Sequence, residues 1–459
     1  MSKAQVIEAL TKELGKKKVI TEPEDLICYS FDATADMPSK LPDVVVVPGD
    51  TGEVVKIINI ANQFKTPIYP RGSGTNLSGG TIPIHGGIVV SMQGMNRILE
   101  IDADNMVAVV QPGVIIQDLN NAVAPFGLIY PPDPGTVATA TMGGSVSECS
   151  GGLRGLKYGV TKHYVMGIEV VLADGKVARY GGKTVKNVTA YDMVKLFTGA
   201  EGTLGIITEV TVKIIPAPEA KKAMLAIFSN LSDAGNTVTE IVRSKVIPAT
   251  MEIMDQVTIR TVENFAKVGL PTDAEALLLI EVDGIPEVVE REATTVVKVV
   301  EKNNGKIKVA KDDKERDNLW AARRSALPAL AQVKPTTVLE DATVPRSRLT
   351  DMLVALQGIA QKYNLQIGTF GHAGDGNLHP TILTDARDAE EMKRVHQAVD
   401  EIFKIALEMG GTISGEHGIG IAKAKYLPLE FGEHGVEAMR KVKRALDPDN
   451  LLNPGKMLS

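Results

Sequence analysis

Two short glycine-rich segments in the last fifth of the chain carry histidines and acidic residues at spacings that suit a metal site. GHAGDGNLH contains His372 and His379, and SGEHGIG contains Glu416 and His417. If Asp375-Gly376 forms a two-residue hairpin turn, His372 and His379 become a cross-strand pair. The Cβ atoms of such a pair lie about 4.5–5.5 Å apart on one face of the sheet. Both imidazoles could then reach one metal ion.

Glu416 would add an oxygen ligand, and three protein ligands would leave positions open for a substrate. Two neutral imidazoles and one carboxylate suit Zn²⁺, Mn²⁺ or Fe²⁺. His417 would then be available as a base. The alternative is that His372 and His379 are satisfied sheet histidines, but the surrounding glycines make little core around them. The remaining histidines have no comparable setting and are expected on the surface or in loops: His85, His163, His396 and His434.

Three glycine-rich stretches indicate a second kind of chemistry. They are RGSGTNLSGG at 71–80, TMGGSVSECSGGLRGLKYG at 141–159 and GAEGTLG at 199–205. Backbone rich in glycine can approach an anion closely and aim several N–H groups at it. Any one stretch could instead serve tight turns or bulges. Together they predict a large phosphate-bearing cofactor, because small hydroxyl and amide donors accompany them: Ser73, Thr75, Asn76, Ser78, Ser145 and Ser147.

The spacing of these glycines excludes two common nucleotide-binding motifs. A dinucleotide fingerprint G-x-G-x-x-G that starts at Gly72 requires glycine at position 77, where the chain has Leu77. A Walker A loop that ends at Gly182-Lys183-Thr184 requires glycine at position 177, where the chain has Val177. Neither motif explains the glycine-rich stretches.

The composition is that of an average globular protein. The 459 residues are enough for two or three domains, and 44% are hydrophobic and 23% charged. A net charge of −6 without a basic stripe argues against a nucleic-acid partner. The start of the chain lacks the apolar core of a signal peptide, and no run approaches about eighteen apolar residues, so a cytoplasmic, soluble protein is predicted. Cys28 and Cys149 are too few for a disulfide framework or an iron–sulfur cluster.

The elements that position the first two glycine stretches are expected to form an α+β region. A strand at 43–48, an amphipathic helix at 51–64 and a strand at 67–70 form a β-α-β unit whose exit carries the first glycine stretch. Further expected elements are strands at 87–92 and 106–113, a helix near 115–124, and a hairpin with Asp174-Gly175 at its turn. Pro216-Ala217-Pro218 marks a domain boundary.

From residue 221 to about 414, strands alternate with helices, which predicts a second sheet covered by helices. The tail is expected to hold a helix closed by a proline-rich stop and to pack back near the cofactor. Expected strands lie at 224–228, 277–282, 336–339 and 366–370, and expected helices at 232–245, 286–303, 346–363 and 388–409.

Six motifs in a fixed order carry a resemblance to a known family. PRGSGTN, GGLRGLKYG, EGTLGIITE, GHAGDGNLH, SGEHGIG and LLNPGK resemble the flavin-dependent 2-hydroxy-acid dehydrogenases of the vanillyl-alcohol-oxidase (PCMH-type) FAD fold. This group contains D-lactate dehydrogenase, the flavin subunit of glycolate oxidase and D-2-hydroxyglutarate dehydrogenase. The resemblance runs from about residue 20 to the end. It implies an α+β fold with an FAD-binding domain of two α+β subdomains at 1–218, a cap domain with a helix-covered, mainly antiparallel sheet at 219–415, and a C-terminal segment at 416–459 that packs back on the FAD domain.

The resemblance also assigns roles to residues. It implies metal ligation by His372, His379 and Glu416, a base at His417, and a carboxylate-binding arginine at Arg323, whose planar fork suits a 2-hydroxy acid, with Arg324 as the alternative. Trp320 would line that wall or belong to the core. FAD would be non-covalent, because no histidine stands near Thr75. The residues implied to bind FAD are Pro70, Arg71, Gly72, Ser73, Gly74, Thr75, Asn76, Pro134, Gly135, Thr141, Gly143, Gly144, Ser147, Gly151, Gly152, Tyr158, Gly202, Gly205, Ile206, Ile207 and Asn453.

One departure from the family bears on the substrate. Members that act on hydroxyglutarate resemble K-Y-D-x-S-L-P where this chain has Leu339-Glu340-Asp341-Ala342-Thr343-Val344-Pro345, so the lysine for a second carboxylate is missing. The resemblance therefore favours oxidation of D-lactate to pyruvate, with glycolate or D-2-hydroxyglutarate as alternatives. Loss of the Cα hydrogen as hydride or as a proton fits the same residues.

Electrons must then leave to a separate acceptor, because the chain has no iron–sulfur motif and no nicotinamide fingerprint. Candidates are a quinone, oxygen, an iron–sulfur subunit and an electron-transfer flavoprotein, and a protein partner is favoured. Two other functions stay open: a non-catalytic flavoprotein subunit of an electron-transfer complex, and an alcohol or sugar oxidase on the same fold that needs neither metal nor arginine.

Overall fold

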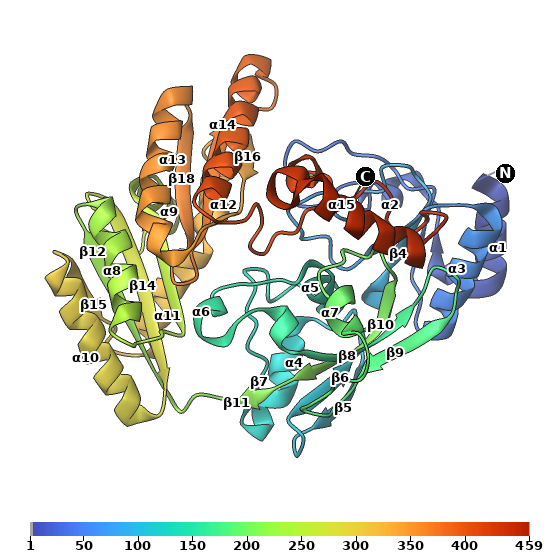
Figure 1. Cartoon of the computed structure of the whole chain (residues 1–459), viewed down its shortest axis with the longest axis horizontal. Coiled ribbons are helices and arrows are strands. Elements are labelled where there is room, and N and C mark those ends of the chain that lie inside the picture. Colours follow the sequence, from blue (N-terminus) through green and yellow to red (C-terminus); the bar gives the residue numbers. More distant parts are fainter. Residues whose placement is uncertain (1–2, 459) are drawn as a thin grey trace. The chain divides into compact units, whose positions relative to one another are not determined.

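The computed structural model describes residues 3–458, which divide into two compact units with α+β architecture (Figure 1). Unit 1 comprises the chain up to Ser150, Val160–Ala217 and the chain from Glu416 onward. Unit 2 comprises Gly151–Gly159 and Pro218–Gly415. The second half of the second glycine-rich stretch therefore belongs to unit 2.

The first sheet of unit 1 has the order β1-β2-β4-β3, with β2 and β3 parallel to β4 and β1 antiparallel to β2. Helix α3 (Thr51–Phe64) connects β2 to β3, as predicted, and β4 inserts between the two strands. The helix begins after Asp50, whose side chain accepts a hydrogen bond from the Glu53 N–H. Its apolar face packs into one core with α1 (Lys3–Leu14) and the sheet. The strands are β1 (Val19–Ile20), β2 (Val44–Val46), β3 (Ile68–Arg71) and β4 (Ile88–Ser91).

The second sheet of unit 1 is antiparallel, in the order β5-β6-β10-β8-β9. Its central strand, β10, starts directly after the third glycine-rich stretch. The β8–β9 hairpin turns at Asp174-Gly175, as predicted, with Gly175 at a φ of +79°. The strands are β5 (Ile98–Asp102), β6 (Val107–Val110), β8 (Val165–Val171), β9 (Val177–Gly181) and β10 (Ile206–Lys213). The other elements of unit 1 before Glu416 are α2 (Pro23–Ile27), α4 (Ile116–Val123), α5 (Met142–Glu148), α7 (Met193–Phe197), and the pair β7 (Leu128–Ile129) and β11 (Ile215–Pro216).

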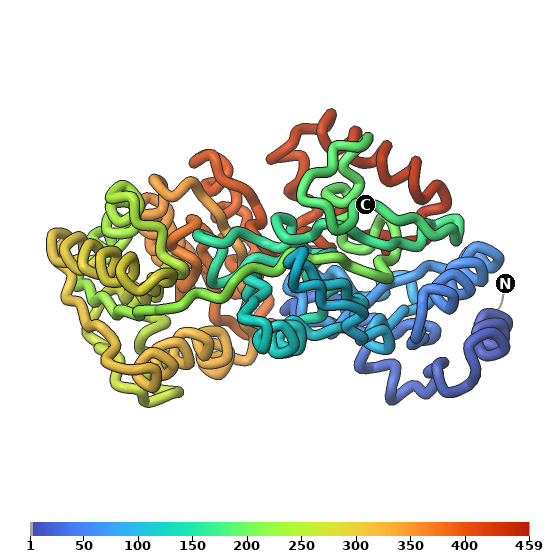
Figure 2. The backbone as a smooth tube through the Cα atoms, turned by 90° about the horizontal axis from the view of Figure 1, so that it is seen from below, coloured from blue at the N-terminus to red at the C-terminus, as the bar shows by residue number. Residues whose placement is uncertain are grey.

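The C-terminal segment packs onto unit 1, to which it belongs. Figures 1 and 2 show helix α15 (Leu427–Leu446), drawn in red, beside the green segment that contains α7. After the helix, Leu452 forms a parallel bridge with Ile68 of β3. Lys443 in the helix donates a hydrogen bond to the Thr203 carbonyl in the third glycine-rich stretch, at 2.7 Å. The described residues that follow the helix are therefore part of the same unit as the first and third glycine-rich stretches.

Unit 2 contains one large antiparallel sheet, in the order β15-β12-β14-β13-β18-β19-β16, with β17 also pairing with β19. The predicted helix-covered antiparallel sheet is confirmed. The strands are β12 (Ala220–Phe228), β13 (Thr250–Asp255), β14 (Ala276–Gly284), β15 (Lys306–Val309), β16 (Thr336–Leu339), β17 (Ala342–Thr343), β18 (Gln366–His372) and β19 (Asn377–Thr384).

Helices cover both faces of this sheet. Helices α9 (Gln256–Ala266), α11 (Asp313–Arg324) and α12 (Ala326–Leu330) pack through one cluster that includes Leu225 of β12 and Phe370 of β18. Phe228 of β12 points to the other face, since side chains alternate along a strand, and lies beside Val300 of α10. The remaining long helices are α8 (Leu231–Arg243), α10 (Pro286–Lys302), α13 (Leu349–Tyr363) and α14 (Ala389–Glu408).

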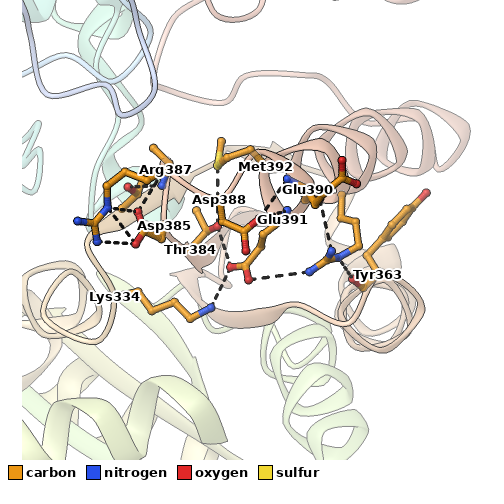
Figure 3. Close-up of polar contacts among 12 residues, drawn as sticks. Lys334, Tyr363, Thr384, Asp385, Arg387, Asp388, Glu390, Glu391 and Met392 are labelled. Carbon is orange, nitrogen blue, oxygen red and sulfur yellow. Dashed lines mark hydrogen bonds and ion pairs between the residues drawn. The ribbon is translucent and has the colours of Figure 1, made fainter.

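The start of α14 is fixed to the sheet by a polar network (Figure 3). Asp388 caps the helix by accepting hydrogen bonds from the N–H groups of Glu390 and Glu391. The Glu391 carboxylate accepts from Lys334 Nζ and Thr384 Oγ1, both at 2.8 Å. Thr384 ends β19, so the network holds the helix at the end of the strand that carries His379. Among residues 3–458, no helix is both long enough and apolar enough to cross a membrane.

Candidate functional site

The first and third glycine-rich stretches and the first half of the second converge in unit 1. A Cβ at Gly72 in the first stretch would lie 2.2 Å from Thr141 Oγ1, and a Cβ at Gly202 in the third would lie 2.4 Å from Pro70 Cγ. The third stretch is also tied to α5 in the second, because Gly199 N–H donates to the Val146 carbonyl, at 2.9 Å. These approaches are closer than any residue with a Cβ allows.

Polar atoms of the first two stretches and of the C-terminal segment are buried without a hydrogen-bond partner among residues 3–458. They include Ser78 Oγ, Ser145 Oγ and Asn453 Oδ1, and these three residues are at most 3% exposed. Buried polar groups are normally hydrogen-bonded, so each of these atoms calls for a ligand or water. The amide of Asn453 uses its other end to donate to the carbonyls of Gly80 and Glu201, at 2.9 and 2.7 Å. These hydroxyl donors and the amide acceptor fit a polar ligand held beside the first two stretches and Asn453.

Other predicted cofactor residues have structural contacts of their own. Arg71 is buried, and its guanidinium donates to the carbonyl of Phe31 at 2.8 Å and to Thr81 Oγ1 at 3.1 Å. Gly143 packs against Pro112, which a Cβ would approach to 2.5 Å. These two positions hold the loops together, and their contact with a cofactor stays a prediction. In unit 1 the predicted residues lie in or beside the three stretches, at Pro134 and Gly135, or in β10, and Asn453 lies in the C-terminal segment. Gly151, Gly152 and Tyr158 lie in unit 2.

A buried lysine is hydrogen-bonded to the end of the first glycine-rich stretch. Lys456 is 3% exposed and donates from Nζ to the carbonyls of Gly79 and Ile82, at 2.9 and 2.5 Å. Burial lowers the pKa of Lys456 to about 7, against the attraction of Asp32 and Glu201. The LLNPGK motif thus donates hydrogen bonds to carbonyls in and beside the first glycine-rich stretch from both Asn453 and Lys456.

The histidine hairpin of unit 2 differs from the predicted two-residue turn. His372 pairs with Asn377, and His379 pairs with Phe370, so four residues from Ala373 to Gly376 form the turn. The predicted cross-strand pair is therefore wrong. Gly374 leaves the ladder because its N–H donates to the Met251 carbonyl in β13, at 3.1 Å.

The two histidines are nevertheless diagonal neighbours on one face of the sheet, since His379 lies two residues beyond the partner of His372. Their ring centroids are 5.2 Å apart and their planes nearly perpendicular, at 87°. A ring nitrogen of each lies within 4.8 Å of one on the other, and the residues are 7% and 3% exposed. The expected convergence of the two imidazoles is therefore present through a different register.

Glu252 in β13 joins the histidine pair to Arg323. One carboxylate oxygen lies 2.8 Å from His372 Nδ1, and the other lies 2.6 Å from Arg323 Nη2. Burial alone would raise the pKa of Glu252, but the charges and hydrogen bonds of His372 and Arg323 outweigh it and lower the pKa below its usual value. Sequence reasoning missed this residue. Its one signal in the sequence was a single acid between the apolar residues Met251 and Ile253.

Arg323 stands on the same face as the histidines. It is 5% exposed, and its guanidinium lies 4.7 Å from the centroid of the Phe370 ring, which itself lies 5.4 Å from the His379 ring. Arg323 Nε is buried and has no hydrogen-bond partner in the part of the chain that the structure describes. Arg324, the alternative considered from the sequence, is exposed. The geometry therefore favours Arg323 as the anion-binding arginine.

Asp341 places the chain that leads to Glu416. Its carboxylate lies within 4.8 Å of a His379 nitrogen and is fully buried. The same carboxylate accepts hydrogen bonds from Ser414 Oγ and the Gly415 N–H, at 2.9 and 2.8 Å. Glu416 is the next residue, with its Cα about 3.8 Å from that of Gly415. Asp341 therefore fixes the backbone of unit 2 up to Gly415, and metal ligation by Glu416 stays a prediction.

The Gly151–Gly159 segment packs against the turn of the histidine hairpin. A Cβ at Gly155 would lie 2.4 Å from Asp375 Oδ2, and a Cβ at Gly374 would lie 2.6 Å from Leu156 Cδ2. Tyr158 OH donates to the Asp283 carboxylate of β14, at 2.7 Å. Part of a predicted cofactor-binding stretch and the two predicted metal ligands thus belong to one unit.

Trp320 belongs to the core of unit 2, with an additional hydrogen bond. It is 8% exposed, packs with Leu153 and Leu279, and donates from Nε1 to Glu281 at 2.8 Å. The remaining histidines are exposed, as predicted: His85, His163, His396 and His434.

Comparison with known proteins decides the family. The model for an FAD binding domain matches residues 42–181, and that for the C-terminal domain of FAD linked oxidases matches residues 217–457. The chain belongs to the FAD-linked oxidase family. It is 51% identical to glycolate oxidase subunit GlcD of Bacillus subtilis (strain 168), over 98% of this chain and 97% of that one. It is 37% identical to D-lactate dehydrogenase of Archaeoglobus fulgidus, over 97% and 98%.

Solved structures support the fold. p-Cresol methylhydroxylase with substrate bound superposes with a TM-score of 0.83 at 19% identity, covering 99% of this chain and 96% of that one. The PCMH-type FAD fold predicted from the motifs is confirmed. This chain is accordingly an FAD-dependent oxidoreductase. Its similarity to glycolate oxidase subunit GlcD and D-lactate dehydrogenase supports oxidation of a hydroxy acid.

Proposed function

We propose that this chain oxidises a short 2-hydroxy monocarboxylate to the 2-oxo acid, with non-covalent FAD and one divalent metal ion. The observation that carries the proposal is the buried wall of unit 2, where His372, His379 and Arg323 share one face around Glu252. An alcohol or sugar oxidase has no use for a buried arginine with an unpaired Nε beside two imidazoles. A 2-hydroxy acid offers the carboxylate and the hydroxyl that these groups recognise.

The metal would be held by His372, His379 and Glu416. Glu252 accepts the Nδ1–H of His372 in the neutral tautomer, which leaves Nε2 as the ligand atom. Metal-binding histidines usually donate their second N–H to a carboxylate or carbonyl in this way. Three protein ligands leave positions for the hydroxyl and one carboxylate oxygen of the substrate. Zn²⁺, Mn²⁺ and Fe²⁺ all suit this ligand set.

Each residue then has one task. Arg323 holds the substrate carboxylate through its guanidinium, whose Nε–H is unpaired, while Glu252 and the Phe370 ring fix the guanidinium plane. His417 takes the hydroxyl proton as the substrate is oxidised, and the buried wall excludes water from the reacting carbon. When bound, the metal supplies a Lewis acid that lowers the hydroxyl pKa, and FAD supplies the two-electron acceptor.

The substrate is proposed to be glycolate or D-lactate. The relatives named for these activities are 51% and 37% identical to the chain. Leu339 is half-buried at the end of β16, one step before Glu340 and Asp341, and offers no cation for a second carboxylate. D-2-hydroxyglutarate is therefore expected to be a poor substrate.

Electrons are proposed to pass to a separate protein. The Bacillus subtilis relative is named as a subunit, which supports a partner in a larger complex. An iron–sulfur subunit and an electron-transfer flavoprotein both have the one- or two-electron chemistry that reoxidises a flavin.

The proposal is tested by anaerobic mixing of purified flavoprotein with a panel of D- and L-2-hydroxy acids, followed at the flavin absorbance. We expect glycolate and D-lactate to bleach the flavin, and L-lactate and D-2-hydroxyglutarate to do so at least ~100-fold more slowly. L-Lactate misplaces its Cα hydrogen, and D-2-hydroxyglutarate brings a second carboxylate for which the chain offers no cation at Leu339. A flavin that no 2-hydroxy acid reduces would instead indicate the non-catalytic subunit.

A further inference from the structure

Glu201 in the third glycine-rich stretch reaches the backbone of the SGEHGIG segment. Its two carboxylate oxygens accept hydrogen bonds from the N–H groups of Ile419 and Gly420, at 2.6 and 2.7 Å. The residue is 5% exposed and has a φ of +50°, an uncommon backbone conformation for a residue with a side chain. A strained, buried acid that binds two successive N–H groups is a specific arrangement, and the first of those groups lies two residues beyond His417.

The backbone of Glu201 is itself fixed on both sides. Its N–H donates to the Ser147 carbonyl in α5, at 2.9 Å, and its carbonyl accepts from Asn453 Nδ2, at 2.7 Å. The side chain therefore projects from a rigid point in the predicted cofactor-binding loops. The hydrogen bonds of Glu201 therefore fix Ile419 and Gly420 relative to these loops.

The SGEHGIG segment has little freedom to move around these bonds. A Cβ at Gly418 would lie 2.0 Å from Glu148 Oε2 and 3.0 Å from Glu201 Oε1, and a Cβ at Gly420 would lie 2.1 Å from the Ser78 carbonyl. That carbonyl also accepts from the N–H of Ile421, at 2.9 Å. The glycines are required for this close approach, and both have positive φ, at +80° and +49°.

We infer that Glu201 is a positioning residue for Glu416 and His417, which it sets relative to the flavin-binding loops through the backbone of Ile419 and Gly420. The inference rests on the proposed function, in which Glu416 is a metal ligand and His417 the base. In this role Glu201 contacts neither metal nor substrate, since both of its carboxylate oxygens are bound to the N–H groups of Ile419 and Gly420. It acts by fixing the far end of the segment that carries both groups.

Glu201→Gln tests the inference, because an amide replaces one acceptor oxygen with a donor that faces a backbone N–H. We expect the Zn²⁺ dissociation constant, measured on the FAD-loaded protein by competition with a chromophoric chelator, to rise about 10-fold or more. The limiting rate of anaerobic flavin reduction by glycolate or D-lactate should fall about 10- to 100-fold. FAD content should match the wild type, whereas the melting temperature should fall, because a buried backbone N–H loses its acceptor. A merely structural role would leave the Zn²⁺ affinity of the folded protein unchanged.

Two further variants sharpen the result. Glu169→Gln is the matched control, because Glu169 is a glutamate of β8 in unit 1 that is 6% exposed. Its carboxylate accepts hydrogen bonds from Thr51 and Thr208, and neither residue belongs to the SGEHGIG segment. It should retain wild-type Zn²⁺ affinity and reduction rate. Glu201→Asp keeps the charge but is one methylene shorter, so it should fall between the wild type and Glu201→Gln, and it carries the test if Glu201→Gln does not fold.

The inference is overturned if Glu201→Gln binds Zn²⁺ and reduces its flavin as the wild type does, or if it loses FAD and rate together while Zn²⁺ affinity stays unchanged. Failure of the proposed function looks different. In that case the wild-type flavin itself is not reduced by any 2-hydroxy acid.

Discussion

Replacing His379 by alanine is expected to lower the limiting rate of flavin reduction by glycolate or D-lactate about 10³-fold. Removing one of two imidazoles opens the proposed metal site, and the Lewis-acid contribution to oxidation is worth several kcal/mol, of which ~4 kcal/mol corresponds to this factor. His379 is 3% exposed, and its ring lies between those of His372 and Phe370. The rate is measured by anaerobic stopped-flow absorbance, with metal content determined on the same preparation.

The matched control for this variant is His434→Ala, because His434 is an exposed histidine of α15. It should retain both the metal and the rate. His379→Ala should retain FAD, because the three glycine-rich stretches converge without it. Normal activity in His379→Ala without metal would favour an alcohol or sugar oxidase over the proposed 2-hydroxy-acid enzyme.

The second large effect is expected at Arg323. In the double variant Arg323→Met/Glu252→Gln, the KM for glycolate or D-lactate should rise about 100-fold, because two charge-assisted hydrogen bonds to the substrate carboxylate are lost. The double variant is needed because Arg323→Met alone would leave the buried Glu252 charge uncompensated, at a cost of about 3–5 kcal/mol in stability. The amide oxygen that the double variant carries in place of the Glu252 carboxylate can still accept from His372 Nδ1, so the metal site should persist.

Steady-state kinetics with an artificial electron acceptor measures this effect. Glu252→Gln alone reports the contribution of the shared carboxylate, and Arg324→Met is the matched control because Arg324 is the exposed neighbour on the same helix. Arg324→Met should leave KM within about two-fold of the wild type, since surface changes rarely affect a site. An unchanged KM in the double variant would remove Arg323 from substrate recognition.

Local patterns were enough to predict many elements of both units, but only four of the eight strands of the large sheet. The helix at Thr51–Phe64 has a capping aspartate at Asp50 and an apolar face of period 3.6, so its bounds are those predicted. The β8–β9 hairpin contains Asp-Gly at its turn. The strand β13 at Thr250–Asp255 was missed, because Glu252 and Asp255 interrupt its apolar pattern. The acids are there for long-range contacts that sequence spacing does not reveal.

The histidine hairpin shows why residue types were easier to predict than their register. Asp375-Gly376 fits a two-residue turn, but position 376 needs glycine for a different reason. A Cβ there would lie 2.1 Å from the Val344 carbonyl. The length of the turn is therefore set by contacts with neighbouring segments, namely the Met251 carbonyl beside Gly374 and the Val344 carbonyl beside Gly376. The histidines still converge because a diagonal pair on one face is also within reach.

The partners of Arg323 could not be derived from the sequence either. Its role was implied by resemblance, whereas its ion pair with Glu252 joins residues on α11 and β13 that are far apart in the chain. Only the tertiary structure shows that one carboxylate serves both the arginine and His372. The same holds for Glu201, whose partners Ile419 and Gly420 lie more than two hundred residues away.

The most direct measurement of the central claim compares flavin reduction before and after metal removal. The purified flavoprotein is dialysed against a chelator, its metal and FAD contents are determined, and its reduction by glycolate and D-lactate is followed anaerobically before and after Zn²⁺, Mn²⁺ or Fe²⁺ is restored. We predict that reduction falls at least ~10³-fold with the metal and returns when about one ion per flavin is rebound. Full reduction by a metal-free protein that retains His372, His379 and Glu416 would contradict the account.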